Sequence, residues 1–333
     1  MSGHTRLRVL VVMDELRTIK PGMDSTVAII SETFDRDHTV DVCTGEQLAL
    51  VDGGPIAQVR RVVAIGHDEL PELGKNTSTS PLRGYDAVLM RKNPPFDGEY
   101  FVQTLILDRA RDDCVLVNDP RGLRDANEKL AILDFPGLIP RTLVTRSIAE
   151  LHGFLAVCDG DVVVKPLNDY GGRGVVRVLA DDQNRDALFE LATCDGTRLT
   201  MAQNYIAGAE FGDKRILLLA GKPIGSYLRR GPPGMLRSNV RAGGTVEACE
   251  MTAHDRAICD AVGERLRARG LHFVGIDVVG GCLTEINVTS PCGIRELMRV
   301  TGERVECTIV DWLEDIVAAR GSNHKSAEFN AKR

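Results

Sequence analysis

The sequence has no Cys-x-x-Cys pair, no strongly basic segment and no long apolar run. Its nine cysteines are scattered and odd in number, which argues against a disulfide framework and a structural zinc site and favours a reducing compartment. The net charge of −6 comes without a basic cluster, so no nucleic-acid partner is expected. The apolar run that opens the chain is too short for a signal peptide or a membrane span, and no later segment is long enough to span a bilayer. We therefore expect a cytoplasmic protein with no membrane partner.

The chain is long enough, at 333 residues, for two or three domains, and its composition is that of a globular protein. Strand and helix patterns alternate through about the first 120 residues, which predicts an open α/β domain. The expected strands are 7–13, 39–43, 57–63, 86–91 and 115–118, and the expected helices are 24–34 and 99–111. The polar segment 65–83 is interpreted as a surface loop, and a helix is expected to start within 123–130.

A second unit is expected to begin near residue 130, with strands at 142–145, 161–167, 175–179 and 200–206 and helices at 147–155 and 181–193. Two strands joined by a tight turn follow at 213–224. The arginine-rich segment 228–244 has little periodicity and is either a lid or an ordinary surface loop. Helices are expected at 252–269 and 305–319, and the tail 321–333 is expected to fray.

The stretch 273–288 is expected to form two strands joined at Gly280-Gly281, and it carries Asp277, Glu285 and Asn287. Glu285 and Asn287 are two apart and share a face, and hard oxygen donors of this kind suit magnesium. A two-residue turn would send Glu285 to the face opposite Asp277, so a shared site needs an odd loop count, such as a three-residue loop with a bulge. The alternative is that Asp277 caps a turn and the other two face water.

Two further segments carry charge where a strand is expected to end or to be buried. Lys165 lies within an apolar strand and is followed by the glycine-rich NDYGGRG segment at 168–174. A lysine there must reach water or meet an anion, and glycine-rich backbone can approach phosphate, although an ordinary hairpin turn remains the alternative. Arg91 follows a buried strand and precedes two prolines, a place where α/β sheets bind ligands, or where a solvated loop lies.

Taken together, six segments make the chain resemble the ATP-grasp ligases and, within them, the bacterial glutathione synthetases. They are RKNPPFD (91–97), LRDANEKL (123–130), MAQNYI (201–206), GDKR (212–215), FVGID (273–277) and LTEINVTSPCGIRE (283–296). The resemblance implies a mixed α/β and α+β architecture, an ATP-grasp fold preceded by an open α/β N-terminal domain. It implies the division 1–122 (N-terminal domain), 123–203 (small lid subdomain), 204–320 (C-terminal subdomain with the metal site) and 321–333 (polar tail).

The resemblance also implies the reaction: ATP activates γ-glutamylcysteine as an acyl phosphate, and glycine displaces the phosphate. Magnesium, or manganese in its place, would be held by Asp277, Glu285 and Asn287. ATP would be bound by Lys129, Lys165, Gly171, Gly172, Gln203, Asn204 and Tyr205. The dipeptide would be contacted by Arg91, Asp213 and Arg295, and the catalytic arginines would be Arg215, Arg230 and Arg237.

The glycine-rich loop departs from the family pattern, because Arg173 stands where a small residue is expected. A related ligase that joins another acid to another amine is therefore an alternative, as is a nucleotide-binding regulatory protein without activity. The resemblance further implies a homo-oligomer, often a homotetramer.

Overall fold

The computed structural model describes residues 6–66, 68–158, 160–232 and 243–331. It divides into two compact units. Unit 1 comprises Met1–Arg124, Arg267–Phe273 and Thr289–Arg333, and unit 2 comprises Asp125–Leu266 and Val274–Val288. The C-terminal part of the chain thus packs with the N-terminal domain, because the chain returns to unit 1 after the second unit is complete.

Unit 1 is built on a sheet whose strand order is β3-β4-β2-β1-β6-β7, with β5 paired to β4. The parallel centre consists of β1 (Arg8–Val12), β2 (Thr39–Cys43), β6 (Ala87–Met90) and β7 (Val115–Val117). The antiparallel flank consists of β3 (Leu48–Val51), β4 (Gly54–Ala64) and β5 (Glu72–Pro81). The central strands are almost wholly buried, as their continuous apolar sequences predict. The expected open α/β domain is confirmed.

In the described ranges, five α-helices belong to this unit, and the first two are capped by aspartate side chains. They are α1 (Ser25–Asp35), α2 (Gly98–Asp108), α3 (Pro120–Asp125), α7 (Ile294–Thr301) and α8 (Val305–Ala331). Asp24 caps α1 by accepting hydrogen bonds from the backbone N–H groups of Thr26 and Val27. Asp97 caps α2 in the same way, through the N–H of Tyr100.

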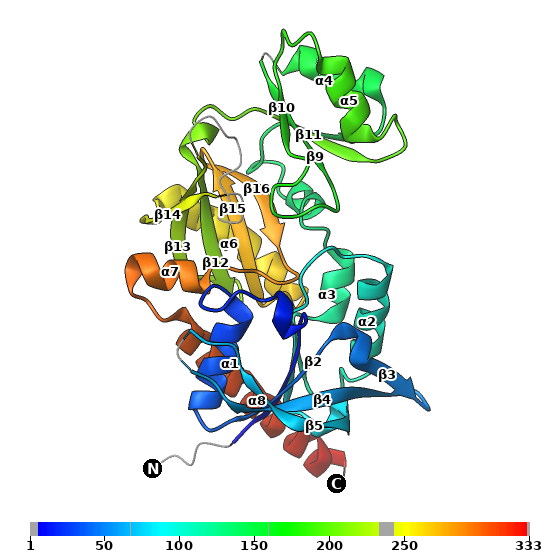
Figure 1. Cartoon of the computed structure of the whole chain (residues 1–333), viewed down its shortest axis with the longest axis vertical. Coiled ribbons are helices and arrows are strands. Elements are labelled where there is room, and N and C mark those ends of the chain that lie inside the picture. The colour runs from blue at the N-terminus through cyan, green and yellow to red at the C-terminus, as the bar shows by residue number, and fades with distance from the viewer. Residues whose placement is uncertain (1–5, 67, 159, 233–242, 332–333) are drawn as a thin grey trace. The chain divides into compact units, whose positions relative to one another are not determined.

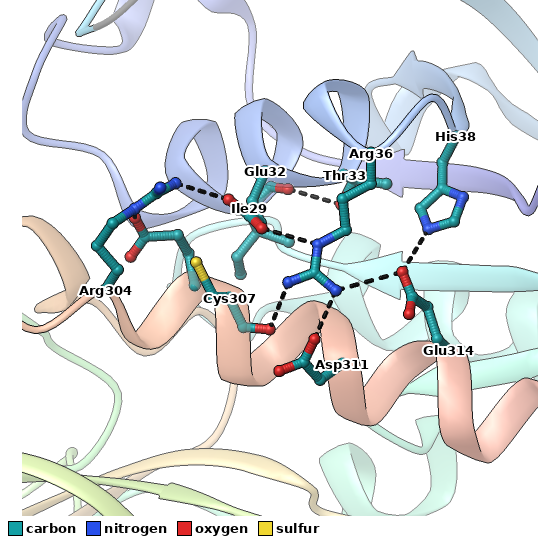
Figure 2. Close-up of polar contacts among 10 residues, drawn as sticks. Ile29, Glu32, Thr33, Arg36, His38, Arg304, Cys307, Asp311 and Glu314 are labelled. Atoms are coloured by element: carbon teal, nitrogen blue, oxygen red, sulfur yellow. Dashed lines mark hydrogen bonds and ion pairs between the residues drawn. The ribbon is translucent and has the colours of Figure 1, made fainter. Parts of the chain in front are cut away.

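A polar cluster joins α1 to α8 (Figure 2). Arg36 donates to Glu32 on its own helix and reaches Asp311 and Glu314 on α8, at 2.7, 2.5 and 3.3 Å. His38 accepts a hydrogen bond from the N–H of Leu7 at its Nδ1 atom and contacts Glu314 through Nε2. These contacts hold the C-terminal helix against the first helix of the chain.

Two expectations for unit 1 were wrong. The segment 65–83 was expected to be a loop, but Glu72–Pro81 forms β5 because the outer edge of β4 offers hydrogen bonds that no local pattern reveals. The tail from 321 was expected to fray, but α8 continues to Ala331, since extending an existing helix costs far less than starting one. Arg295 and Glu296 lie in α7.

Unit 2 contains two antiparallel sheets. The four-stranded sheet has the order β10-β9-β11-β8, from β8 (Thr142–Thr145), β9 (Val162–Pro166), β10 (Val176–Val178) and β11 (Thr200–Asn204). Helices α4 (Ile148–Val157) and α5 (Arg185–Thr193) pack on it around Phe154, Phe189 and Val164 (Figure 1). The helix expected at 181–193 therefore begins four residues late.

The five-stranded sheet has the order β14-β13-β12-β15-β16. Its strands are β12 (Asp213–Leu219), β13 (Lys222–Arg230), β14 (Thr245–Ala248), β15 (Phe273–Val279) and β16 (Cys282–Asn287), and helix α6 spans Ala253–Ala268. Part of the expected lid 228–244 is thus strand, because β13 runs to Arg230. The helix expected over 123–130 is also wrong: α3 ends at Asp125, and Lys129 instead precedes a short 3-10 helix, η4 (Leu130–Asp134).

No helix in the described ranges is both long and apolar enough to cross a membrane.

Candidate active site

The hairpin of β15 and β16 places Asp277 directly opposite Glu285. Gly280 and Gly281 form the turn with positive φ angles of 52° and 81°, and Val279 pairs with Cys282, so the turn itself has two residues. The register then shifts between Asp277 and Val278, which leaves Thr284 as the extra residue of a bulge. The expected bulge is present, but it lies in the strand and not in a three-residue loop. It turns both carboxylates to one face of the sheet.

Asp277 lies at the centre of a buried network of two carboxylates and two guanidinium groups. Arg215 donates to both of its carboxylate oxygens, at 2.5 and 3.0 Å. Arg229 contacts Asp277 at 2.9 Å and also pairs with Asp213, with 2.9 Å between Nε and Oδ1. Burial disfavours the charged form of Asp277, but Arg215 and Arg229 outweigh it and hold its pKa well below the usual range.

Arg229 was missed as a site residue in the sequence, where it was assigned to the arginine-rich loop. The available signal was strand pairing across the Gly221 turn, which places Arg229 opposite Asp213 in register. Asp213, assigned there to substrate contact, is held by Arg229 in this structure.

Two lysines from other elements of unit 2 reach the hairpin. The Nζ atom of Lys129 lies 3.1 Å from Glu285 Oε1 and donates to the carbonyl of Asp169 at 2.5 Å. The Nζ atom of Lys165, on β9, donates to the carbonyl of Thr284 at 3.1 Å. Both lysines are buried, and burial lowers the pKa of Lys165 to about 8. The structure therefore brings these two lysines together with Glu285.

The glycine-rich loop between β9 and β10 begins beside Asp169, the residue that Lys129 contacts. Gly171, Gly172 and Gly174 have φ angles of 65°, 73° and 67°, a left-handed backbone that turns successive N–H groups in one direction. A Cβ atom on Gly174 would lie 2.7 Å from the Pro166 side chain, so this position also requires glycine for space.

Arg173, the departure from the family pattern, is exposed, and its guanidinium stacks over the Tyr170 ring at 5.1 Å. The interaction is internal to the loop. Among the described contacts, the side chain of Arg173 donates no hydrogen bond to the backbone of the neighbouring glycines.

Gln203 and Asn204 end β11 and Tyr205 follows it, and all three are among the residues assigned to ATP. Gln203 donates to the hydroxyl of Thr142 at 3.0 Å, and the side chain of Asn204 donates to the carbonyl of Tyr205 at 3.2 Å. The backbone N–H of Tyr205 is bonded to the carbonyl of Asp161, so it is occupied by the sheet itself. The Tyr205 ring lies 3.7 Å from the guanidinium of Arg177.

Of the two catalytic arginines expected in the lid, Arg230 lies within the described residues. Arg230 lies on β13 and bonds to Glu247 of β14 at 2.8 Å and to the carbonyl of Phe211 at 2.8 Å. Arg237 lies outside the described residues.

Arg91 and Arg295 belong to unit 1. Arg91 follows β6 and is fully enclosed, where it donates to Thr26 Oγ1 at 3.2 Å and to the carbonyl of Pro291 at 2.9 Å. Burial lowers its pKa, with no carboxylate bonded to it in the described contacts. Arg295, in α7, pairs with Asp68 at 3.1 Å, and its Nε atom is buried without a partner. Both are cations with donors available to an anion.

The oxygen donors of Asp277, Asn287 and Glu285 suit a divalent ion. Asp277 Oδ2 already accepts from Arg215, Arg229 and Asn287, but Oδ1 accepts only from Arg215 among the described contacts and keeps a lone pair. In the described contacts the amide nitrogen of Asn287 is the donor, which leaves its oxygen available as an acceptor. Glu285 is a quarter exposed, at 24%. Two carboxylates and an amide oxygen therefore fit a hard cation.

The fold defines the class of protein. The structure is similar to D-cycloserine synthetase DcsG, with a TM-score of 0.63 and 15% identity over 93% of this chain and 99% of that one. It is also similar to a RimK domain protein ATP-grasp from Sphaerobacter thermophilus, with a TM-score of 0.59, 19% identity and coverage of 91% and 98%. The chain has the ATP-grasp fold, with an additional N-terminal domain, as the sequence predicted.

Two family models match the chain. Residues 7–124 match the N-terminal domain of prokaryotic glutathione synthetase, and residues 128–302 match its ATP-grasp domain. The chain is 42% identical to the glutathione synthetase of Nitrosomonas europaea over 320 residues, which cover 94% of this chain and 99% of that one. It is 40% identical to that of Gloeobacter violaceus, with coverage of 92% and 96%. The chain belongs to the prokaryotic glutathione synthetase family, and the resemblance stated from the sequence is confirmed.

Proposed function

We propose that the protein joins γ-glutamylcysteine to glycine with ATP and releases glutathione, ADP and phosphate. The observation that carries this proposal is the bulged hairpin, which faces Asp277 and Glu285 to one side beside Lys129 and Lys165. A metal–triphosphate complex carries a positive ion and negative phosphates. A buried site that holds both carboxylates and lysines can bind it, because the carboxylates pair with the metal ion and the lysines with the phosphates. The family supplies the identity of the acid and the amine.

The lysines would bind ATP phosphates. Lys129 bonds to Glu285 in the structure, so a phosphate oxygen would take the place of that carboxylate oxygen at Nζ. The N–H groups of Gly171 and Gly172 would cover the phosphates, since Lys129 also fixes the start of this loop through Asp169. The adenine would lie at the end of β11, where Gln203, Asn204 and Tyr205 stand.

A divalent ion, magnesium or manganese, would be held by Glu285, the amide oxygen of Asn287 and Asp277 Oδ1. When bound, it would supply charge neutralisation between the phosphates. An ATP-grasp ligase of similar fold, PsnB, was solved with Mg and ADP. Release of Glu285 from Lys129 by a phosphate would free that carboxylate for the ion, so nucleotide and metal would bind together.

In the first step, a carboxylate oxygen of γ-glutamylcysteine would bond to the γ-phosphorus while the bond from phosphorus to ADP breaks. In the second, the glycine nitrogen would attack the carbonyl carbon of the acyl phosphate, phosphate would leave, and the amine would lose a proton to solvent. Arg215 and Arg229 would stabilise the transferring charge, because they already surround a carboxylate in a dry setting.

Arg91 and Arg295 of unit 1 would bind the dipeptide. The two arginines suit its carboxylates because each is buried with donors to spare.

Purified protein should release ADP from Mg-ATP only when γ-glutamylcysteine and glycine are both present. Release of ADP with another acid or amine, and not with this pair, would show that the protein catalyses a different ligation. An absence of release with any pair, while ATP still binds, would mean that the protein is a nucleotide-binding relative without turnover.

A further inference from the structure

A row of charged side chains crosses the five-stranded sheet of unit 2. Arg229 on β13 pairs with Asp213 on β12, and Arg215 on β12 pairs with Asp277 on β15. Arg229 also contacts Asp277 at 2.9 Å, so the two pairs form one cluster. The next strand, β16, carries Glu285 directly opposite Asp277. Positive and negative charges therefore alternate along the row until β16, where a second carboxylate stands beside the first.

The two guanidinium groups of the cluster are fixed parts of the fold. Arg215 and Arg229 are both buried. Burial opposes the charged form of Arg229, but Asp213 and Asp277 outweigh it and keep its pKa above the ordinary range. Gly275 on β15 leaves the space in which Arg215 lies, because a Cβ atom there would be 3.1 Å from a guanidinium nitrogen. Both arginines are therefore permanent positive charges, each held by carboxylates in a dry place.

The charges of the row limit how many divalent ions the site can hold. Sites of phosphoryl transfer often hold two such ions, about 3.5–4 Å apart, each bound by one or two carboxylates. Arg215 and Arg229 already match the charges of Asp277 and Asp213 at hydrogen-bond distance. In the described contacts, Glu285 is the carboxylate of the row that no arginine contacts. The row therefore has unmatched negative charge for one ion, and a second ion would have to displace an arginine.

We propose that Arg229 takes the place of a second divalent ion, so that the site holds one ion per chain. The guanidinium group would supply, from the protein itself, the positive charge that a second metal supplies elsewhere to a transferring phosphoryl group. Arg229 lies outside the six segments that carry the family resemblance, so the resemblance does not imply this role. The inference rests on the proposed phosphoryl transfer and adds the number of ions that accompany it.

The first test counts the Mn²⁺ ions that the full chain binds together with a non-hydrolysable ATP analogue, by electron paramagnetic resonance of the free ion. The wild-type chain should bind one ion. The variant Arg229→Gln should bind two, with the second ion held at least about 100-fold more tightly than by the wild-type chain, because the opposing positive charge is gone. The matched control is Arg265→Gln, which changes an arginine of α6 paired with Asp134 and should leave one ion bound.

The second test separates charge from the space that the arginine leaves. The double variant D213N/R229Q loses one carboxylate together with the arginine, so the cluster again carries no net charge and should bind one ion. Melting temperatures with the ATP analogue, with and without Mn²⁺, give a further readout. Since an ion that binds only the folded chain stabilises it, Mn²⁺ should raise the melting temperature of R229Q more than that of wild type or of D213N/R229Q.

The inference is overturned if the wild-type chain binds two ions, a result that needs no variant to fold. It is also overturned if R229Q binds one ion or if D213N/R229Q binds two. The assay of ADP release keeps it distinct from the proposed function. Release with γ-glutamylcysteine and glycine, together with two bound ions, would refute the inference alone, whereas one bound ion without release would refute the proposed function alone.

Discussion

The substitution Asp277→Asn should destabilise the protein strongly although it changes no volume. Asp277 is 4% exposed and bonds to Arg215 and Arg229, which are 4% and 7% exposed. Asp277, Asp213, Arg215 and Arg229 together carry no net charge. The substitution leaves this cluster with one uncompensated positive charge. Breaking a buried ion pair from one side costs about 3–5 kcal/mol, far more than a surface pair is worth.

The assay is urea and thermal unfolding, followed by circular dichroism. A loss of this size should lower the melting temperature by about 10 °C. The double variant D277N/R229M should lose less than the sum of the two single losses, because removing Arg229 also removes part of the unpaired charge. A D277N protein that unfolds within about 1 kcal/mol of wild type would refute the buried-network reasoning.

Three further predictions follow from the same site. Glu285→Gln should lower turnover at least about 1000-fold, as expected for a group that holds metal and phosphate charge. It should destabilise the protein less than Asp277→Asn does, because Glu285 is partly exposed. Activity within a few-fold of wild type would remove Glu285 from the metal site. The KM for ATP should be constant below pH 8 and rise above it, because burial lowers the pKa of Lys165 to about 8 and phosphate binds only the protonated lysine. The variant Lys165→Arg should keep a constant KM through this range. Identical pH profiles of KM for the two proteins would contradict the assignment of Lys165 to phosphate. Gly174→Ala should raise the KM for ATP about tenfold, because the new Cβ atom would meet Pro166 and the residue has a φ of 67°. The control Gly137→Ala, whose Cβ atom would meet nothing within 4 Å, should leave this KM unchanged. Equal changes in KM for the two variants would show that the loop does not bind phosphate.

Much of the parallel sheet of unit 1 could be predicted from its sequence. Its strands are continuous apolar runs, and Asp24 and Asp97 are N-cap residues that mark the starts of the helices after them. β5 could not be predicted, because its Ser and Thr residues become a strand only where β4 offers an edge. The full length of α8 was missed for a similar reason, since the polar sequence after residue 320 gives no local sign of the helix it extends.

The hairpin at the site shows where sequence reasoning reaches its limit. Counting residues across Gly280 and Gly281 establishes that Asp277 and Glu285 share a face only if one residue is added. The count cannot say where that residue lies, because a bulge at Thr284 and a longer turn give the same parity. Arg229 illustrates a second limit: its pairing with Asp213 depends on strand register, and the sequence assigned it to a loop.

The most direct test of the proposed function follows oxygen from the acid to phosphate. γ-Glutamylcysteine labelled with ¹⁸O in its cysteinyl carboxylate is converted with Mg-ATP and glycine, and the phosphate released is analysed by mass spectrometry or ³¹P NMR. Transfer through an acyl phosphate predicts one labelled oxygen in each phosphate and the other in the new amide. Phosphate without label, formed while glutathione accumulates, would contradict the account.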